Sequence, residues 1–319
     1  MPPGTSPQTT NPKPGPPKPN SPFTIFDRAV KVAQKDRAAS RRPVSADRRS
    51  FEGNPGDSSR LTDYVRSALA ENVAERLLDI KRPHSTIVEI GSGPGSLRQF
   101  LDVSQTKTQR LIMCDSSEKM LYRDQHLDSQ APFEIERRVM DEEFLEFEEN
   151  SLDCVVSIGS LQWTNDLPGA LIQIRRALKP DGVFVGAICG GDTLFELRTS
   201  LQLAEQEREG GISARVSPMA ESSDMASLLS RAGFNIPTID VDDVTVSYPS
   251  MFELIHDLRD MGESNAIINR RPNLQRDTLL SAAATYQALH GNEDGTIPAT
   301  FSVIFMVSRQ YLCDSSAQG

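Results

Sequence analysis

The stretch 86–97, TIVEIGSGPGSL, decides the fold of this chain. Its first half is a short apolar run rich in β-branched residues, which favours a buried strand. Gly91, Gly93 and Gly95 follow within five residues, and an apolar segment begins at Leu97. Glycine lacks a Cβ and tolerates positive φ, so such a loop lets the backbone approach a ligand closely. The pattern predicts a strand, a ligand-binding loop and a helix whose free N–H groups face that ligand.

The spacing of the glycines separates two classes of nucleotide ligand. Dinucleotide sites place glycines at positions one, three and six. Here they fall at one, three and five, and Ser96 holds the sixth position. With Glu89 two residues before the first glycine, the stretch resembles the first motif of class I S-adenosylmethionine (SAM)-dependent methyltransferases. SAM carries a cationic amino acid and no pyrophosphate, which suits a carboxylate at the strand end. A tight strand-to-helix turn without a ligand is the alternative.

The segments after this motif alternate between strand and helix patterns, which predicts a parallel sheet with helices on both faces. Strands are expected at 110–114, 133–140, 153–158, 183–188 and 238–246, with a last strand at 300–307 closing the sheet. Helices are expected at 23–40, 61–80, 118–127, 166–178, 223–232, 250–261 and 274–290, and a tight turn at 179–182. The expected fold class is therefore α/β, a Rossmann-like class I methyltransferase fold. It has a seven-stranded, mostly parallel sheet, helices on both faces and added covering helices.

One covering helix begins after the fifth strand. Thr193 and Glu196 match a capping box, and glycines at 210–211 stop the helix. Its apolar stripe predicts a covering role, with Arg198 and Glu205 exposed. The chain divides into a disordered tail (1–22), a basic helix and linker (23–60), the methyltransferase-like domain (61–312) and a short tail (313–319).

Composition narrows the class of partner. The chain has 319 residues and a net charge of −10, although residues 1–60 are net positive. An acidic main domain argues against nucleic acid, which needs a basic surface, and tolerates basic protein partners. Apolar runs are too short to span a membrane, which leaves peripheral contact possible. Residues 1–22 contain no arginine, so a cleaved mitochondrial presequence cannot be recognised.

Metal ligands and reactive thiols are not indicated. The chain has four cysteines and four histidines, and no C-x-x-C pair or two-histidine-one-carboxylate pattern occurs. Buried free thiols are expected, and no metal site is predicted. The cysteines are Cys114, Cys154, Cys189 and Cys313.

The candidate site lies where successive strands end, because ligands of open α/β sheets bind there. The first strand supplies the glycine loop, the second a carboxylate for the ribose hydroxyls, and the third carboxylates for the adenine. The segment after the fourth strand is expected to face the reacting end of the cofactor. The cofactor-binding candidates are Glu89, Gly91, Ser92, Gly93, Gly95, Asp115, Ser116, Met120, Asp141, Glu142 and Ser157. The substrate-facing candidates are Gln162 and Trp163.

Longer stretches narrow the resemblance. IFDRAVKVAQKDRAA (25–39), GGDTLFELRTSLQLAEQEREGG (190–211), YPSMFELIHDLRDMGESNA (248–266) and NEDGTIPATF (292–301) are similar to a family of mitochondrial complex I assembly factors of the arginine-hydroxylase type. The resemblance covers roughly residues 25–312. It implies a matrix protein, peripheral to the inner membrane, that binds SAM and works beside other assembly factors. It also implies hydroxylation of an arginine on a matrix-side complex I subunit. Gln162 stands where the family pattern has histidine.

The residues themselves predict SAM binding and do not show how oxygen is activated. Two alternatives therefore stay open. One is an O-methyltransferase of a small acid or quinone, because methyl transfer depends largely on positioning two reactants. The other is a SAM-binding assembly chaperone without turnover. The catalytic residues, the target residue and the oligomeric state are left undetermined by the sequence.

Overall fold

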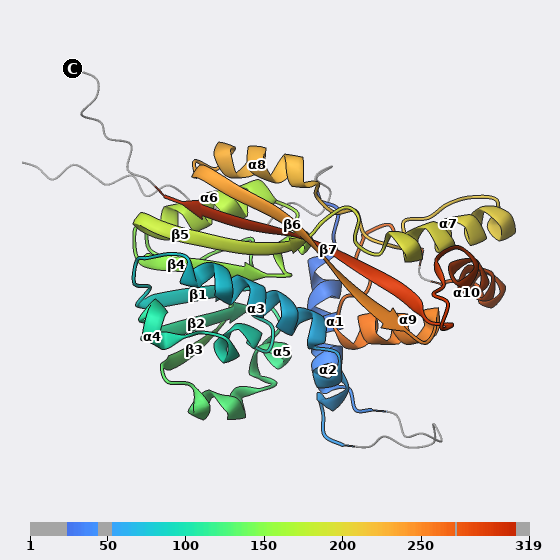
Figure 1. Cartoon of the computed structure of the whole chain (residues 1–319), viewed down its shortest axis with the longest axis horizontal. Helices are drawn as coiled ribbons and strands as arrows, with labels where there is room; N and C mark the ends of the chain where they lie inside the picture. Colours follow the sequence, from blue (N-terminus) through green and yellow to red (C-terminus); the bar gives the residue numbers. More distant parts are fainter. Residues whose placement is uncertain (1–23, 44–52, 272, 311–319) are drawn as a thin grey trace, which may run out of the picture.

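A computed structural model of the chain describes residues 24–43, 53–271 and 273–310. The two predicted tails, part of the predicted linker and Cys313 lie outside the described residues. Seven strands form one sheet in the order β3-β2-β1-β4-β5-β7-β6. Figure 1 shows this sheet with helices on both sides.

Five strands run parallel, with β1 at the centre between β2 and β4. They are β1 Thr86–Ile90, β2 Arg110–Asp115, β3 Glu134–Val139, β4 Leu152–Ile158 and β5 Leu178–Cys189. β6 Asn235–Tyr248 and β7 Ile297–Arg309 are antiparallel, and β7 lies between β5 and β6. The seven-stranded, mostly parallel sheet is thus confirmed. β7, the last of these strands in chain order, is internal, and β6 forms the edge of the sheet on that side, opposite β3.

Two apolar layers enclose the sheet because its central strands are buried on both faces. On one face α3 Tyr64–Leu78 packs Leu69, Val73 and Leu77 against β1, β2 and β4. On the other, α6 Leu167–Ala177 and α8 Ser222–Arg231 pack against β4 and β5. The helix expected at 61–80 is confirmed from Tyr64 to Leu78, whereas Leu61 ends the separate short helix α2 Asp57–Leu61 and is exposed.

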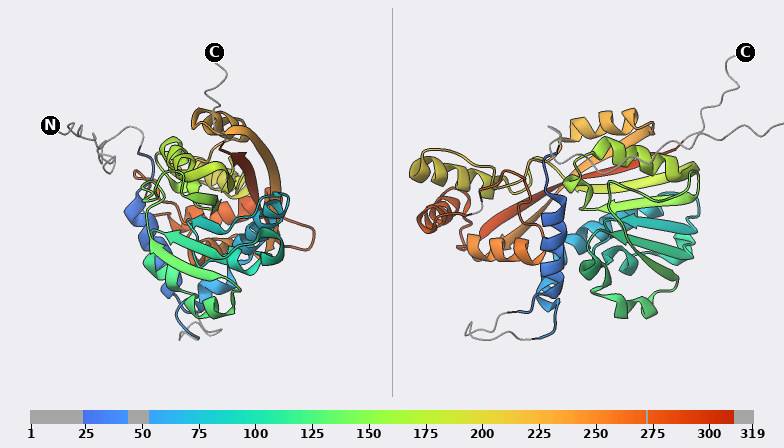
Figure 2. Two further views of the ribbon diagram at one scale, coloured as in Figure 1. Left: turned by 90° about the vertical axis from the view of Figure 1, so that its left-hand side faces the viewer. Right: turned by 180° about the vertical axis from the view of Figure 1, so that it is seen from behind.

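A second core lies beside the sheet, in a part of the molecule that we call the lobe. The lobe consists of α7 Phe195–Glu209, α9 Met251–Asp260, α10 Arg276–His290 and the adjoining ends of β6 and β7. Tyr286 and Leu254 are fully buried in it. Figure 2 shows the lobe projecting beyond the sheet. The sequence predicted its helices individually and did not predict that they share a core.

The helix α1 Arg28–Ser40 stands between the sheet and the lobe, as the right-hand view of Figure 2 shows. The Asp27 carboxylate accepts the Val30 N–H at 3.0 Å and begins the helix. Phe26 forms an isolated antiparallel bridge with Ile267. The helix therefore covers the carboxyl ends of the strands.

Several local expectations were wrong. The glycine loop leads into a four-residue 3-10 turn, η1 Ser96–Gln99, and a short helix, α4 Val103–Thr106, instead of a long helix. The helix expected at 118–127 divides into α5 Glu118–Tyr122 and the 3-10 segment η2 Gln125–Gln130. The turn expected at 179–182 is part of β5, because its backbone bonds to Gln310 beside the irregular register with β4.

Tertiary contacts also replace the capping box predicted for α7. The Thr193 hydroxyl donates to the Ser302 carbonyl, and the Glu196 carboxylate accepts from Thr300. Arg198 is half-buried and donates to backbone carbonyls, whereas Glu205 is fully buried. The expectation that both are exposed was therefore wrong, because α7 is packed on two sides.

Candidate functional site

The glycine loop takes a backbone that side chains would disrupt. Gly91, Gly93 and Gly95 have φ values of 68°, 56° and 86°, the left-handed region that favours glycine. A Cβ on Gly91 would lie 2.0 Å from the Ser160 Oγ, and one on Gly95 would lie 2.0 Å from the Met113 Cε. These glycines are required both by φ and by close approach.

Buried polar atoms without partners gather under this loop. Glu89 Oε2, Ser92 Oγ and Ser157 Oγ find no hydrogen-bond partner among the described residues. Ser157 on β4 is the register partner of Ile90 on β1. Burial, only partly offset by Arg66 and Arg98, raises the pKa of Glu89 to about 8. Buried polar atoms are normally hydrogen-bonded, so these three are suited to a ligand with polar groups.

Asp115, at the end of β2, is fully buried and its oxygens are already hydrogen-bonded. Oδ2 accepts the Gly93 N–H at 2.9 Å and Oδ1 accepts the Ser117 N–H at 2.8 Å. The Lys35 Nζ donates to both oxygens, at 2.7 and 2.9 Å. Asp115 therefore links the glycine loop to α1.

The carboxylates after β3 also pair with α1. The Arg28 guanidinium donates to Asp141 at 2.9 Å and forms an ion pair with Glu142. The Ser160 hydroxyl donates to Glu142 at 2.8 Å. Burial alone would raise the pKa of Glu142, but Arg28 and Lys35 outweigh it and hold the pKa below its usual range. Both carboxylate groups predicted to hold a nucleoside are therefore neutralised by one helix.

Trp163, in the 3-10 turn η3 Leu161–Trp163, is buried beside α1. Its ring packs edge-on against Phe26, with 5.3 Å between the ring centroids. Its Nε1–H donates to the Glu263 carboxylate at 2.6 Å. Glu263 belongs to the segment that follows α9, so this contact joins the sheet to the lobe.

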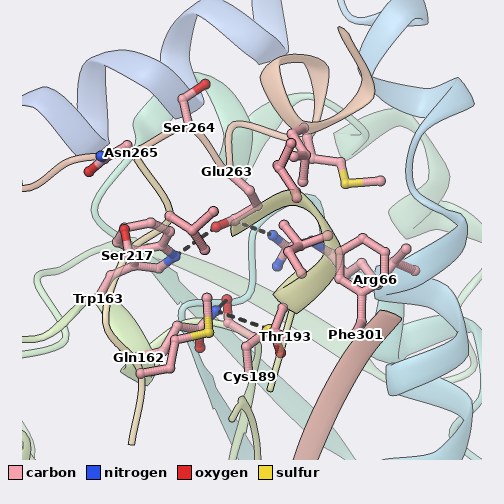
Figure 3. Close-up of a pocket in the computed structure, with 18 of the residues that line it drawn as sticks. Arg66, Gln162, Trp163, Cys189, Thr193, Ser217, Glu263, Ser264, Asn265 and Phe301 are labelled. Atoms are coloured by element: carbon pink, nitrogen blue, oxygen red, sulfur yellow. Dashed lines mark hydrogen bonds and ion pairs between the residues drawn. The ribbon is translucent and has the colours of Figure 1, made fainter. Parts of the chain in front are cut away.

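A cavity of about 250 Å³ opens beside Trp163 and Glu263, between the sheet and the lobe (Figure 3). Its apolar walls include Leu197, Leu201 and Phe301, and its polar lining includes Arg66 and Gln162. The Gln162 Nε2–H donates to the Gly159 carbonyl at 2.9 Å, while its buried Oε1 meets no partner in the described part of the chain.

Arg66 of α3 lies between this cavity and the glycine loop. A Cβ on Gly93 would lie 3.0 Å from its Nη1, and its Nη2 is 3.6 Å from the Glu263 Oε1. The sequence reasoning missed Arg66, because a single cation on an amphipathic helix resembles a solvated side chain. It also missed Glu263 and the three cations of α1, whose spacing at positions 28, 31 and 35 was the available signal.

The structure brings most of the sequence-predicted residues together at the carboxyl ends of β1 to β4. Two of them differ from the others. Ser116 is half-buried, and Met120 packs against Ala38 and Ala39 of α1. Within residues 24–43, 53–271 and 273–310, no group of three or more His, Cys, Asp or Glu is placed to hold a metal ion. Over the same residues, no helix has the length and hydropathy needed to cross a bilayer.

None of the three cysteines that the structure describes has an activated thiol. All three are free; Cys114 and Cys154 are buried as expected, whereas Cys189 is only half-buried. Burial raises the pKa of Cys114 and of Cys189 to about 12. These groups therefore stay protonated near neutral pH.

Comparisons with known proteins agree with this geometry. A family model described as "Methyltransferase domain" matches residues 88–186, which include the glycine loop and β4. The mitochondrial arginine-hydroxylase NDUFAF5 of Danio rerio is 45% identical over 89% of this chain and 82% of its own length.

The chain belongs to the NDUFAF5 arginine-hydroxylase family.

More distant relatives share the fold. A malonyl-[acyl-carrier protein] O-methyltransferase of Methylovorus sp. is 32% identical over 81% of this chain and 86% of its own length. The solved structure of the YcgJ protein of Bacillus subtilis has a TM-score of 0.51 at 13% identity, covering 75% of this chain and 98% of that one. The class I methyltransferase fold is thus confirmed.

Proposed function

We propose that the chain hydroxylates an arginine of a protein, a matrix-side subunit of mitochondrial complex I, during assembly of that complex. The observation that supports this most is the 45% identity to a mitochondrial arginine-hydroxylase over nearly nine-tenths of the chain. The matched region includes more than the cofactor fold, because the family model ends at residue 186, before the lobe begins.

The same proposal places SAM at the carboxyl ends of β1 to β4. The unpartnered atoms of Glu89, Ser92 and Ser157 fit the polar amino-acid end of that molecule. Arg66, which lies beside Gly93, would face the carboxylate of SAM. SAM carries an activated methyl group, which only the methyltransferase alternative would consume.

The nucleoside end fits under one condition. Asp115 can accept ribose hydroxyls, and Asp141 and Glu142 can accept the adenine amino group, only when Lys35 and Arg28 release them. Ser116 and Met120 adjoin the same region. We therefore infer that binding of the nucleoside displaces side chains of α1.

Mass spectrometry of complex I subunits from a strain lacking this chain tests the reaction. Hydroxylation converts one C–H bond into C–OH, a two-electron oxidation in which dioxygen would supply the oxygen atom and a cellular two-electron reductant would carry the second oxygen atom to water. The expected result in the deletion strain is loss of a single added oxygen on one arginine. A strain carrying Gly93→Arg, which would place a large cation against Arg66, should show the same loss. Subunits with unchanged masses in the deletion strain would contradict the proposal.

A second function is favoured by the likeness to a malonyl-[acyl-carrier protein] O-methyltransferase. In that case the chain would transfer the methyl group of SAM to an oxygen of a small acid or quinone. Purified chain with SAM and malonyl-acyl carrier protein would then release S-adenosylhomocysteine. Failed complex I assembly in the deletion strain with unchanged subunit masses, together with no release of S-adenosylhomocysteine by the purified chain, would instead favour a SAM-binding chaperone.

The proposed location is supported by the same family. We propose that the chain works in the mitochondrial matrix, peripheral to the inner membrane, beside other assembly factors. Its relatives are named as mitochondrial proteins. Fractionation should recover the chain with mitochondria and release it from the inner membrane in alkaline carbonate. Recovery in the cytosol would contradict this placement.

A further inference from the structure

Three cations project from α1 into the region that joins the sheet and the lobe. Arg28, Lys31 and Lys35 are spaced i, i+3 and i+7, which places them on one face of the helix. The first and third hold the carboxylates predicted to bind a nucleoside. Lys31 has other partners, and its side chain is only 3% exposed.

The partners of Lys31 form a cation cage, made of the Trp163 ring, the Glu263 carboxylate and the Gly262 carbonyl. The Lys31 Nζ lies 3.6 Å from the centroid of the ring. It donates to Glu263 Oε2 at 2.7 Å and to the Gly262 carbonyl at 2.8 Å. The Trp163 Nε1–H donates to the same Oε2, which fixes the carboxylate at the edge of the ring.

An ammonium group is an expensive occupant of this cage. Desolvation, only partly offset by Glu263, lowers the pKa of Lys31 to about 8. A guanidinium is more weakly hydrated than an ammonium, stacks on aromatic faces and keeps its charge in such surroundings. An aromatic face with an adjoining carboxylate therefore suits a guanidinium better than the lysine it holds.

The cage also adjoins space for the rest of an arginine side chain. Trp163 and Glu263 both line the 250 Å³ cavity, whose apolar walls include Leu197 and Leu201 of α7. Arg66 approaches the opposite carboxylate oxygen, Oε1, at 3.6 Å, which leaves Oε2 to the cage. An aliphatic stem can thus lie along α7 with its cationic end at Glu263.

We propose that the cation cage is the site that receives the guanidinium of the substrate arginine, and that Lys31 fills it as an intramolecular stand-in. This inference rests on the proposed function, in which arginine is the substrate. In this arrangement α1 competes with the arginine for the cage and with the nucleoside for Asp115, because the helix that holds Lys31 in the cage also holds Lys35 on Asp115. Displacement of α1 by the nucleoside therefore also frees the cage for the arginine.

The test uses the full chain and Nα-acetyl-L-arginine amide as the probe. Trp163 is the only tryptophan, so its fluorescence emission reports on the cage directly. Lys31→Ala should bind the probe at least about tenfold more tightly than the unaltered chain, because the competing occupant is gone. Nα-acetyl-L-citrulline amide, which is similar in shape and neutral, should bind at least about tenfold more weakly to Lys31→Ala.

Two variants control for other effects. Arg37→Ala removes an exposed cation from the same helix and should behave as the unaltered chain. Lys31→Ala combined with Glu263→Gln should lose the preference for arginine over citrulline. If Lys31→Ala does not fold, Lys31→Leu removes the charge, keeps part of the buried stem, ends two atoms short of the lysine Nζ and should show the same order of affinities.

Equal binding of the arginine and citrulline probes, or equal affinity of the unaltered chain and the Lys31 variant, would overturn the proposal. This assay needs neither SAM nor turnover, so it is independent of the hydroxylase proposal. Absent binding together with a confirmed arginine modification would reject the cage alone. Arginine-selective binding together with subunit masses that are the same with and without this chain would reject the reaction alone.

Discussion

Replacing Lys35 by methionine tests whether α1 competes with the cofactor. The Lys35 Nζ lies 2.7 and 2.9 Å from the two Asp115 oxygens, and the two side chains are 6% and 0% exposed. Removing one partner of a buried ion pair typically costs about 3–5 kcal/mol. Asp115 keeps the Gly93 and Ser117 N–H groups. We therefore expect the free energy of unfolding to fall by about 2–3 kcal/mol.

Cofactor affinity should change in the opposite direction. Ribose hydroxyls need the same Asp115 oxygens, so the unaltered chain must break the ion pair before it binds, whereas the variant need not. Recovery of even 1.4 kcal/mol of that cost corresponds to about tenfold tighter binding. Isothermal titration calorimetry with S-adenosylhomocysteine measures the affinity, and urea unfolding measures the stability.

The exposed Arg37 again offers a matched control on the same helix. Arg37→Met should change neither quantity. Weaker or equal binding of S-adenosylhomocysteine by a folded Lys35→Met variant would refute the reasoning, because Lys35 would then belong to the cofactor site.

Three further predictions follow from buried groups and the glycine loop. Gly91→Ala should lower the free energy of unfolding by more than about 2 kcal/mol in urea, whereas Gly211→Ala, which meets open space, should change it by less than about 0.5 kcal/mol. Glu205→Ala breaks a buried pair and should cost about 3 kcal/mol, unlike the exposed Glu207→Ala; equal effects would contradict this. Because the folded pKa of Glu89 is about 8, above its ordinary 4.5, the folded chain binds the extra proton and loses stability as pH rises from 4.5 to 8. In Glu89→Gln the free energy of unfolding, measured in urea, should fall less between pH 5 and pH 8 than in the unaltered chain. An equal fall in both proteins would contradict the raised pKa of Glu89.

The sheet was predictable because its signals are local. A short continuous apolar run such as that of β4 is best explained as a buried strand. The closely spaced glycines indicate a sharp turn directly after a strand. The positions of Glu89, Asp115 and Asp141 follow from parallel topology, since strand ends meet at one edge. These residues could be grouped without knowing any side-chain contact.

The features that the sequence did not predict depend on contacts between segments that are distant in the sequence. Lys31 and Lys35 belong to a sequence that resembles an ordinary solvated basic helix, and only the fold buries them against Glu263 and Asp115. Thr193 has a capping pattern, but the backbone of β7 offers its hydroxyl a carbonyl instead. The burial and the hydrogen-bond partners of these side chains are set by which surfaces of the fold pack together. The pattern of a single segment carries no information about that packing.

The internal position of β7 has a consequence for how the chain is made. β7 pairs with β5 through residues 303–309 and with β6 along nearly its whole length, although it is synthesised after the other six strands of this sheet. Until it is present, β5 is an open edge and β6 has no neighbour. A chain ending before residue 297 would therefore lack Phe301 in the cavity wall and expose an unpaired strand, which is prone to edge-to-edge aggregation. We expect even late premature stop codons, placed before residue 297, to yield insoluble protein.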